Sequence, residues 1–94
     1  MAYQNYVLEN ETSSTTFNGY CRDKNGEKDI IEYIQVEDRL GCRNECQNTE
    51  ECVAYAFNRN NINSKNCDLY RNGPYIFGSG KNATTCYVMQ ARSL

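Results

Sequence analysis

The chain has no histidine and no tryptophan, and proline occurs only once in its 94 residues. The absence of histidine excludes Ser-His-Asp and Cys-His catalysis, histidine ligands for zinc and histidine-based pH sensing. No apolar run is as long as ten residues, so we expect no membrane span. Ten Lys and Arg against twelve Asp and Glu give a net charge of −2, which excludes nucleic-acid binding through a strongly basic face.

Cysteine, by contrast, is plentiful, with six residues in this short chain. An even number of cysteines in one small domain favours a disulfide framework in an oxidising compartment. The alternative is a zinc site, but the sequence has no C-x2-C pair, which structural zinc sites favour and which thioredoxin-type redox motifs contain. We therefore expect no metal and no cofactor at the six positions, which are Cys21, Cys42, Cys46, Cys52, Cys67 and Cys86.

Two N-glycosylation sequons agree with secretion. Their acceptor residues are Asn10 and Asn82, although sequons also arise by chance in a chain with thirteen asparagines. The N-terminus has neither the basic start nor the apolar stretch of a signal peptide. We interpret the chain as a mature segment or an excised module of a secreted, extracellular protein.

The pattern of apolar, aromatic and turn-forming residues predicts one helix and several short strands. The helix starts at Glu37 and Asp38, whose charges suit the positive end of the helix dipole, and it carries Cys42 and Cys46 on one face. We expect strands at 30–36, 52–58, 66–71 and 84–89, and loops at 9–16, 58–66 and 72–83. We divide the chain into a polar N-terminal segment (1–19), a folded domain (20–90) and a C-terminal tail (91–94).

Three stretches of the sequence resemble the PAN/apple domain family. They read CRNEC at 42–46, CVAYAFN at 52–58 and CDLY at 67–70, and Cys21 and Cys86 match the outer pair of the apple-like, six-cysteine members. The resemblance implies an α+β fold, a small disulfide-rich domain with one α-helix packed on an antiparallel β-sheet. It also implies the pairing Cys21–Cys86, Cys42–Cys67 and Cys46–Cys52. It does not extend to the polar first 20 residues.

Acidic residues have both a functional and a structural interpretation. Asp23, Asn25 and Gly26 with Glu32 resemble part of an EF-hand calcium loop, but Cys21 would stand at the first ligand position. We therefore favour a hairpin turn there. The neighbouring carboxylates at 37–38 and 50–51 suit a solvated surface, and so short a chain leaves little room for a cleft between two catalytic carboxylates. We expect that the protein is not an enzyme.

The resemblance implies a non-catalytic extracellular binding or adhesion module that recognises a protein or carbohydrate ligand. Two alternatives stay open, namely a structural building block of an extracellular matrix or filament through self-association, and a small cysteine-rich inhibitor or effector. For the ligand site we favour loop 72–83, which offers rings for stacking and basic groups for hydrogen bonds. The candidates are Arg71, Tyr75, Phe77 and Lys81. The competing interpretation is that Phe77 and one tyrosine cap the core while the basic residues stay solvated.

Overall fold

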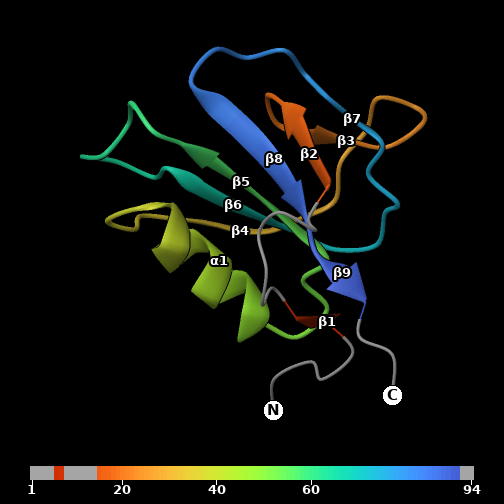
Figure 1. Cartoon of the computed structure of the whole chain (residues 1–94), viewed down its shortest axis with the longest axis horizontal. Helices are drawn as coiled ribbons and strands as arrows, with labels where there is room; N and C mark the ends of the chain where they lie inside the picture. Colours follow the sequence, from red (N-terminus) through yellow and green to blue (C-terminus); the bar gives the residue numbers. More distant parts are fainter. Residues whose placement is uncertain (1–5, 8–14, 92–94) are drawn as a thin grey trace.

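The computed structural model describes residues 6–7 and 15–91 (Figure 1). The elements in chain order are β1 (Tyr6–Val7), β2 (Thr15–Asn18), β3 (Cys21–Arg22), β4 (Ile30–Ile34), α1 (Arg39–Gln47), β5 (Ala54–Asn58), β6 (Cys67–Tyr70), β7 (Phe77–Gly78), β8 (Thr84–Val88) and β9 (Gln90–Ala91). The predicted helix and the four predicted strands are therefore present as α1, β4, β5, β6 and β8. Within the described ranges, no helix has the length and apolar character needed to cross a membrane.

Five strands form one antiparallel sheet in the order β2-β8-β5-β6-β4. Strand β5 lies in its centre and pairs with β6 on one side and with β8 on the other. Two small ribbons, β3-β7 and β1-β9, complete the described strands. Figure 1 shows α1 lying across one face of the sheet, with the β3-β7 ribbon on the far side of β8 from the helix. The result is the α+β architecture that the sequence predicts.

The core has two parts, one on each face of the sheet, because side chains alternate along β5. Tyr55 faces the helix and packs with Leu69 and Met89. Ala54 and Ala56 point to the opposite face, where Tyr70, Tyr75, Cys21 and Cys86 are buried. The small alanine side chains leave room there for the β3-β7 ribbon, and the sulfur of Cys21 comes within 3.7 Å of the backbone oxygen of Tyr55.

Helix α1 begins at an acidic cap, as the sequence predicts. Asp38 is the N-cap residue, and its carboxylate accepts a hydrogen bond from the backbone N–H of Gly41 at 2.9 Å. Just before the cap, Val36 is held to Asn66 by two hydrogen bonds, in which the Asn66 amide accepts from its N–H at 2.8 Å and donates to its carbonyl at 2.9 Å. These contacts fix the angle at which the chain leaves β4 for the helix.

Three disulfides fasten the elements together, and all six cysteines are buried. Cys42–Cys67 joins α1 to β6, Cys46–Cys52 closes the turn after the helix, and Cys21–Cys86 joins β3 to β8. These are the three pairs that the family resemblance implies. The described residues contain no free cysteine.

Two local expectations can be compared with the structure. The loop expected at 9–16 is wrong at its end, because Thr15 and Thr16 belong to β2 and pair with Val88 and Tyr87 of β8. The sheet thus begins before residue 20, where we placed the start of the folded domain. Strand β2 is a polar edge strand, which the sequence does not distinguish from a loop. Residues 8–14, which include Asn10, lie outside the described residues.

The segment at 23–27 is a tight turn. The carboxylate of Asp23 accepts hydrogen bonds from the backbone N–H groups of Asn25 and Glu27, both at 2.9 Å. Gly26 has a φ of +76°, a conformation that glycine adopts without strain. The Asp23 carboxylate thus hydrogen-bonds the backbone of its own turn, and the motif forms the turn that we favoured over a calcium loop. No group of three or more potential metal ligands occurs among the described residues.

Candidate functional site

The four candidate ligand residues do not form one surface. Tyr75 is only 4% exposed and belongs to the core, where its ring meets that of Tyr70 edge to face at 5.2 Å. Its hydroxyl donates to the carbonyl of Arg71 at 2.6 Å and accepts from the N–H of Asp29 at 3.1 Å. This corrects the expectation of an exposed stacking ring, because both the ring face and the hydroxyl of Tyr75 are engaged inside the domain.

Arg71 holds the base of loop 72–83 in place. Its guanidinium donates to the carboxylate of Asp29 at 3.1 Å, and its backbone N–H donates to the carbonyl of the same residue at 2.9 Å. The side chain of Asn72 donates to the other carboxylate oxygen of Asp29. Arg71 therefore joins the chain before β4 to the end of β6, although its half-exposed side chain also reaches solvent.

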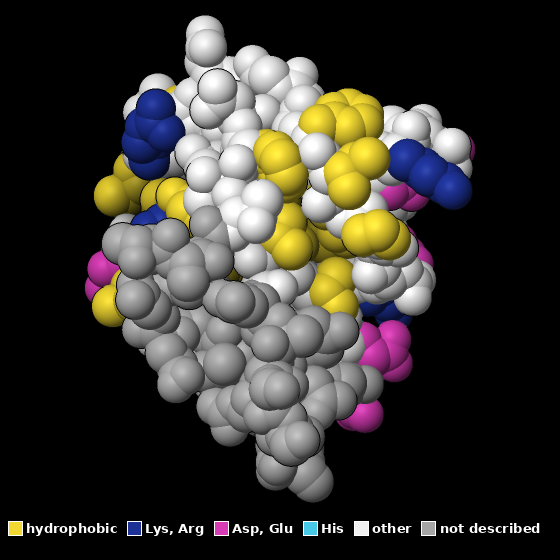
Figure 2. Space-filling view, turned by 45° about the vertical axis from the view of Figure 1, so that its right-hand side comes forward, with side chains coloured by type: hydrophobic (Ala, Val, Ile, Leu, Met, Phe, Trp, Pro, Cys, Tyr) yellow, Lys and Arg dark blue, Asp and Glu magenta, His cyan; other side chains and the backbone are white. Residues whose placement is uncertain are grey.

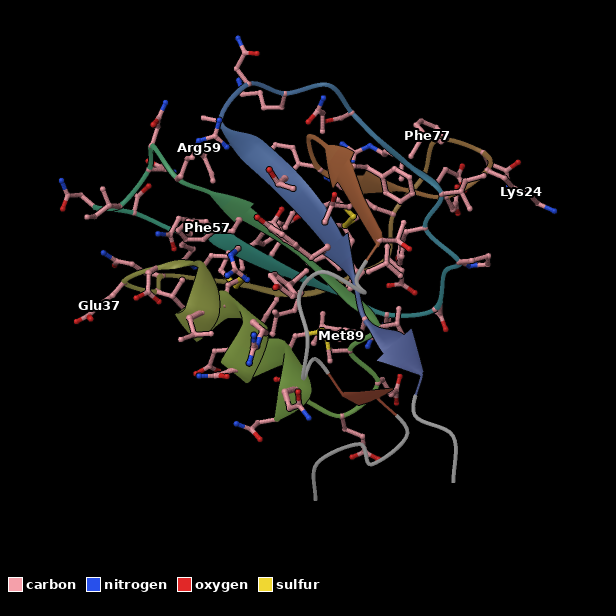
Figure 3. The ribbon with its side chains drawn as sticks, viewed as in Figure 1. Lys24, Glu37, Phe57, Arg59, Phe77 and Met89 are labelled. Carbon is pink, nitrogen blue, oxygen red and sulfur yellow. A yellow bond between two sulfur atoms is a disulfide. The ribbon has the colours of Figure 1, made fainter. Side chains whose placement is uncertain are left out.

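Phe77 and Lys81 are exposed, but they lie in different parts of loop 72–83. Phe77 is 41% exposed on β7. Figure 2 shows that apolar side chains are exposed on one face of the molecule. Figure 3 places Phe77 well away from Arg59. Lys81 lines the same pocket as Arg59, which the next paragraph describes. The structure therefore brings only Lys81 of the four candidates to a pocket with basic groups.

Loops 58–66 and 72–83 meet at a polar pocket of about 250 Å³ at one end of the sheet. We call it the two-loop pocket, and it is lined by Asn18, Arg59 and the segment from Gly80 to Thr85. Arg59 comes from the first loop and Lys81 from the second. Figure 1 shows the chain after β7 passing over this end of the sheet before it starts β8. The sequence identified both loops, but not that they meet, because their contact depends on the pairing of β5 with β8.

Backbone hydrogen bonds fix the walls of the two-loop pocket. The N–H of Arg59 donates to the carbonyl of Ala83 at 2.9 Å, and the N–H of Gly80 donates to the carbonyl of Asn18 at 2.9 Å. The N–H of Gly19 donates to the carbonyl of Thr84 at 2.7 Å. Glycine is required at Gly19, because a Cβ there would collide with the backbone of Gly80. These bonds join three separate parts of the chain, so the pocket has a preformed shape.

Thr84 is the unusual residue of the pocket. It is 2% exposed, and its hydroxyl has no hydrogen-bond partner among the described residues. A buried hydroxyl without a partner costs free energy, and most native structures avoid it. Sequence analysis missed Thr84, which we treated only as part of a strand and of the Asn82 sequon. No signal in the sequence alone distinguishes a buried, unpartnered threonine from an ordinary strand residue.

The charge of the two-loop pocket is positive, although the whole chain is negative. Arg59 and Lys81 line it, no carboxylate is among its lining residues, and neither basic residue forms an ion pair with a described residue. The remaining side chains offer amide and hydroxyl groups, which donate or accept hydrogen bonds. Chemically, this arrangement is suited to holding a polar or anionic group, and it contains no nucleophile paired with a base.

A carboxyl group and a phenol are buried together elsewhere in the sheet, at Asp68 and Tyr70. Burial raises the pKa of Asp68 to about 6, and this effect is partly offset by Lys28, by a hydrogen bond from Tyr70 at 3.4 Å and by Arg22. Burial, followed by the charge of Asp68, raises the pKa of Tyr70 in turn. Asp68 lies on the interior strand β6 and does not line the two-loop pocket. Its environment therefore bears on stability and not on the candidate site.

The structure is that of a small domain cross-linked by three disulfides, with one helix packed on an antiparallel sheet and a preformed pocket between two loops. The chain belongs to the PAN domain family, since residues 15–91 match the family model described as the PAN domain. PAN domains are in general non-catalytic modules that bind proteins or carbohydrates, and they are typical of extracellular proteins. No curated protein and no solved structure matches the chain significantly.

Proposed function

We propose that the protein is a secreted, non-catalytic adhesion module and that the two-loop pocket is the centre of its ligand-binding surface. The observation that carries this proposal is the meeting of two long polar loops over a preformed pocket with two basic side chains. Loops held by a rigid scaffold commonly carry recognition. Here the scaffold is the sheet with its three disulfides.

Within this proposal, the predicted site residues have different roles. Lys81 contacts the ligand together with Arg59, and Phe77 extends the surface toward β7 for a larger ligand. Arg71 and Tyr75 support the loop from inside, because their hydrogen bonds run to Asp29 and to each other.

A binding screen tests the proposal. The wild-type domain and the double variant Arg59→Ala/Lys81→Ala are applied to an array of glycans and to a panel of purified extracellular proteins. The control is Lys24→Ala/Lys28→Ala, which removes the same charge from exposed positions outside both loops and outside the pocket. We expect a ligand that the control retains and that the pocket variant binds at least about tenfold more weakly. A ligand bound equally by all three proteins would place the binding surface elsewhere. Concentration-dependent self-association in light scattering, lost in the pocket variant, would favour the structural building block instead.

We also propose that Asn82 and Asn10 are glycosylation sites of the secreted protein. Asn82 is exposed and lines the two-loop pocket, so a glycan there would narrow access to it. Mass spectrometry of the protein secreted from eukaryotic cells, before and after enzymatic deglycosylation, measures the occupancy of each site. Binding measured on the same two samples then shows whether the Asn82 glycan obstructs the pocket.

A further inference from the structure

We propose that the two-loop pocket is an anion site that takes the acidic sugar unit of a glycan, a ring bearing a carboxylate or a sulfate. This inference rests on the proposed function and names the chemistry of its ligand. Three observations at the pocket carry it: two basic side chains without acidic neighbours, a buried hydroxyl without a partner, and a lining of amide and hydroxyl groups.

The basic side chains set the charge of the ligand. Arg59 and Lys81 come from loops that are far apart in the sequence, and neither forms an ion pair with a described residue. Elsewhere, the basic side chain of Arg71 is paired with Asp29 at 3.1 Å. Two cations without a carboxylate between them repel each other, and an anion placed between them removes this repulsion. An arginine also binds carboxylate or sulfate oxygens with two parallel N–H groups.

The buried hydroxyl adds a donor. Thr84 lines the pocket and is almost fully buried, so its hydroxyl is shielded from water as well as from protein partners. The proposal requires the Thr84 side chain to rotate about its Cα–Cβ bond when the ligand binds. This rotation would bring the buried hydroxyl to an acceptor oxygen in the pocket and give it the hydrogen bond that it lacks. Such a bond is strong when the acceptor is charged.

The rest of the lining favours a sugar over an acidic peptide. Asn18, Asn82 and Thr85 line the same pocket as the two basic residues, and their amide and hydroxyl groups are of the kind that hydrogen-bonds the hydroxyls of a sugar ring. The pocket lining contains no aromatic ring, on which a neutral sugar would stack. A volume of about 250 Å³ suits one compact unit more than an extended peptide, since pockets for larger organic ligands begin near 300 Å³.

Chemical-shift mapping with simple probes tests the inference. The ¹⁵N-labelled domain is made in an oxidising bacterial periplasm that adds no N-glycans, and it is titrated with D-glucuronate, D-glucose 6-sulfate, D-glucose and a blocked Glu-Glu dipeptide. We expect glucuronate, glucose 6-sulfate or both to shift the amides of Arg59 and of residues 80–85 at millimolar concentrations. The acid that binds more tightly identifies the preferred anion. Glucose should cause no such shifts, and added NaCl should weaken the binding.

Single variants assign the effect to the three groups. Arg59→Gln and Lys81→Gln should each weaken the binding about threefold to tenfold, whereas Lys24→Gln should leave it unchanged. Lys24 is an exposed residue at the opposite end of the molecule from Arg59 (Figure 3). Thr84→Val removes the hydroxyl with little change in shape and should also weaken the binding, and Thr84→Ser should restore it. The recovery in the serine variant separates the hydroxyl from an effect on packing.

Three results would overturn the inference. They are binding of glucose as tight as that of the tighter-binding acid, no shift at these amides with either acid at tens of millimolar, and tighter binding of the dipeptide than of both acids. If the screen finds a neutral glycan or a protein whose binding depends on Arg59 and Lys81, only the anion inference fails. If the screen finds only ligands whose binding does not depend on Arg59 or Lys81, both the anion inference and the proposed function fail.

Discussion

Tyr75 shows how a side chain in a loop becomes part of the core. Its neighbourhood in the sequence, with glycines on both sides, suggests an exposed recognition loop. In the structure its ring packs on Tyr70, and its hydroxyl bridges the backbones of Asp29 and Arg71. This bridge ties the strand β4 side of the sheet to the loop after β6.

We therefore expect Tyr75→Ala to lower the free energy of unfolding by about 3–5 kcal/mol, as for a large aromatic residue removed from a core. Tyr75→Phe keeps the ring but loses the two hydrogen bonds and should cost about 1–2 kcal/mol. Urea denaturation followed by circular dichroism measures both. Phe77→Ala is the control, because Phe77 is a nearby aromatic residue that is 41% exposed, against 4% for Tyr75. A loss no greater for Tyr75→Ala than for Phe77→Ala would mean that Tyr75 is not a core residue.

The buried carboxyl of Asp68 makes stability depend on pH. Its pKa rises from 3.8 to about 6 in the folded state, so the folded protein binds the proton more tightly than the unfolded chain. The stabilising contribution of the neutral form is fully present below about pH 4 and is lost as the pH rises through 6. We expect the free energy of unfolding of the wild type, relative to Asp68→Asn, to fall by on the order of 1–2 kcal/mol between pH 4 and pH 7.

Asp68→Asn is the matched reference because asparagine has almost the same shape and does not titrate in this range. Urea denaturation of both proteins at several pH values removes the contribution of all other groups, which the two proteins share. A difference between them that stays constant from pH 4 to pH 7 would show that the Asp68 pKa is the same in the folded and unfolded states.

At the scale of the elements, helix α1 depends on its first turn. The helix is short, and short helices are marginal without caps and tertiary contacts. Asp38→Ala removes the hydrogen bond to Gly41 and should lower the free energy of unfolding by about 1 kcal/mol. Glu37→Ala is the control, because it removes a neighbouring exposed carboxylate that makes no capping bond. Thermal unfolding should show the larger loss for Asp38→Ala, and equal losses would assign the effect to charge alone.

The elements that the sequence predicts are those with local signals. Residues 30–36, 52–58, 66–71 and 84–89 are runs of β-branched, aromatic or alternating residues between turn formers, and they contain β4, β5, β6 and β8. The path of loop 72–83 has no such signal, because distant partners fix it. For example, the hydroxyl of Ser79 accepts from the N–H of Tyr20 at 2.9 Å. The two-loop pocket, which depends on this path, could therefore not be predicted from the sequence. Lys81 is the one predicted ligand-binding residue that lies in it, beside the predicted glycosylation site Asn82.

At the scale of the whole molecule, the two parts of the core contain different disulfides. Cys42–Cys67 and Cys46–Cys52 belong to the core beneath the helix, whereas Cys21–Cys86 belongs to the core on the other face. Both cysteines of this last pair are close in sequence to residues that line the two-loop pocket. Cys21 comes three residues after Asn18, and Cys86 directly follows Thr84 and Thr85. We therefore expect the outer disulfide to hold the walls of the candidate site as well as to stabilise the domain.

Pairwise replacement of cysteine by alanine tests this division. The sequence separations are 65, 25 and 6 residues for the outer, middle and inner disulfides. If each disulfide stabilises the domain through the loop entropy of the unfolded chain, its removal should lower the free energy of unfolding by about 4, 3.5 and 2 kcal/mol in that order. The inner pair, Cys46–Cys52, should therefore be the least costly. Urea denaturation under non-reducing conditions measures the order, and a larger loss for the inner pair than for the outer pair would contradict the entropic account.

Hydrogen exchange then locates the damage. In the Cys21→Ala/Cys86→Ala variant we expect faster exchange at the amides of Gly19 and Gly80, whose hydrogen bonds to Thr84 and Asn18 hold the pocket walls. The amides of α1 should exchange faster only by the factor that the global loss of stability predicts. In the Cys46→Ala/Cys52→Ala variant, the amides of the same two glycines should exchange faster only by the factor that the lower free energy of global unfolding predicts. Uniform acceleration over the whole sheet in both variants would show that the domain opens as one unit, and the outer disulfide would then have no separate role at the pocket.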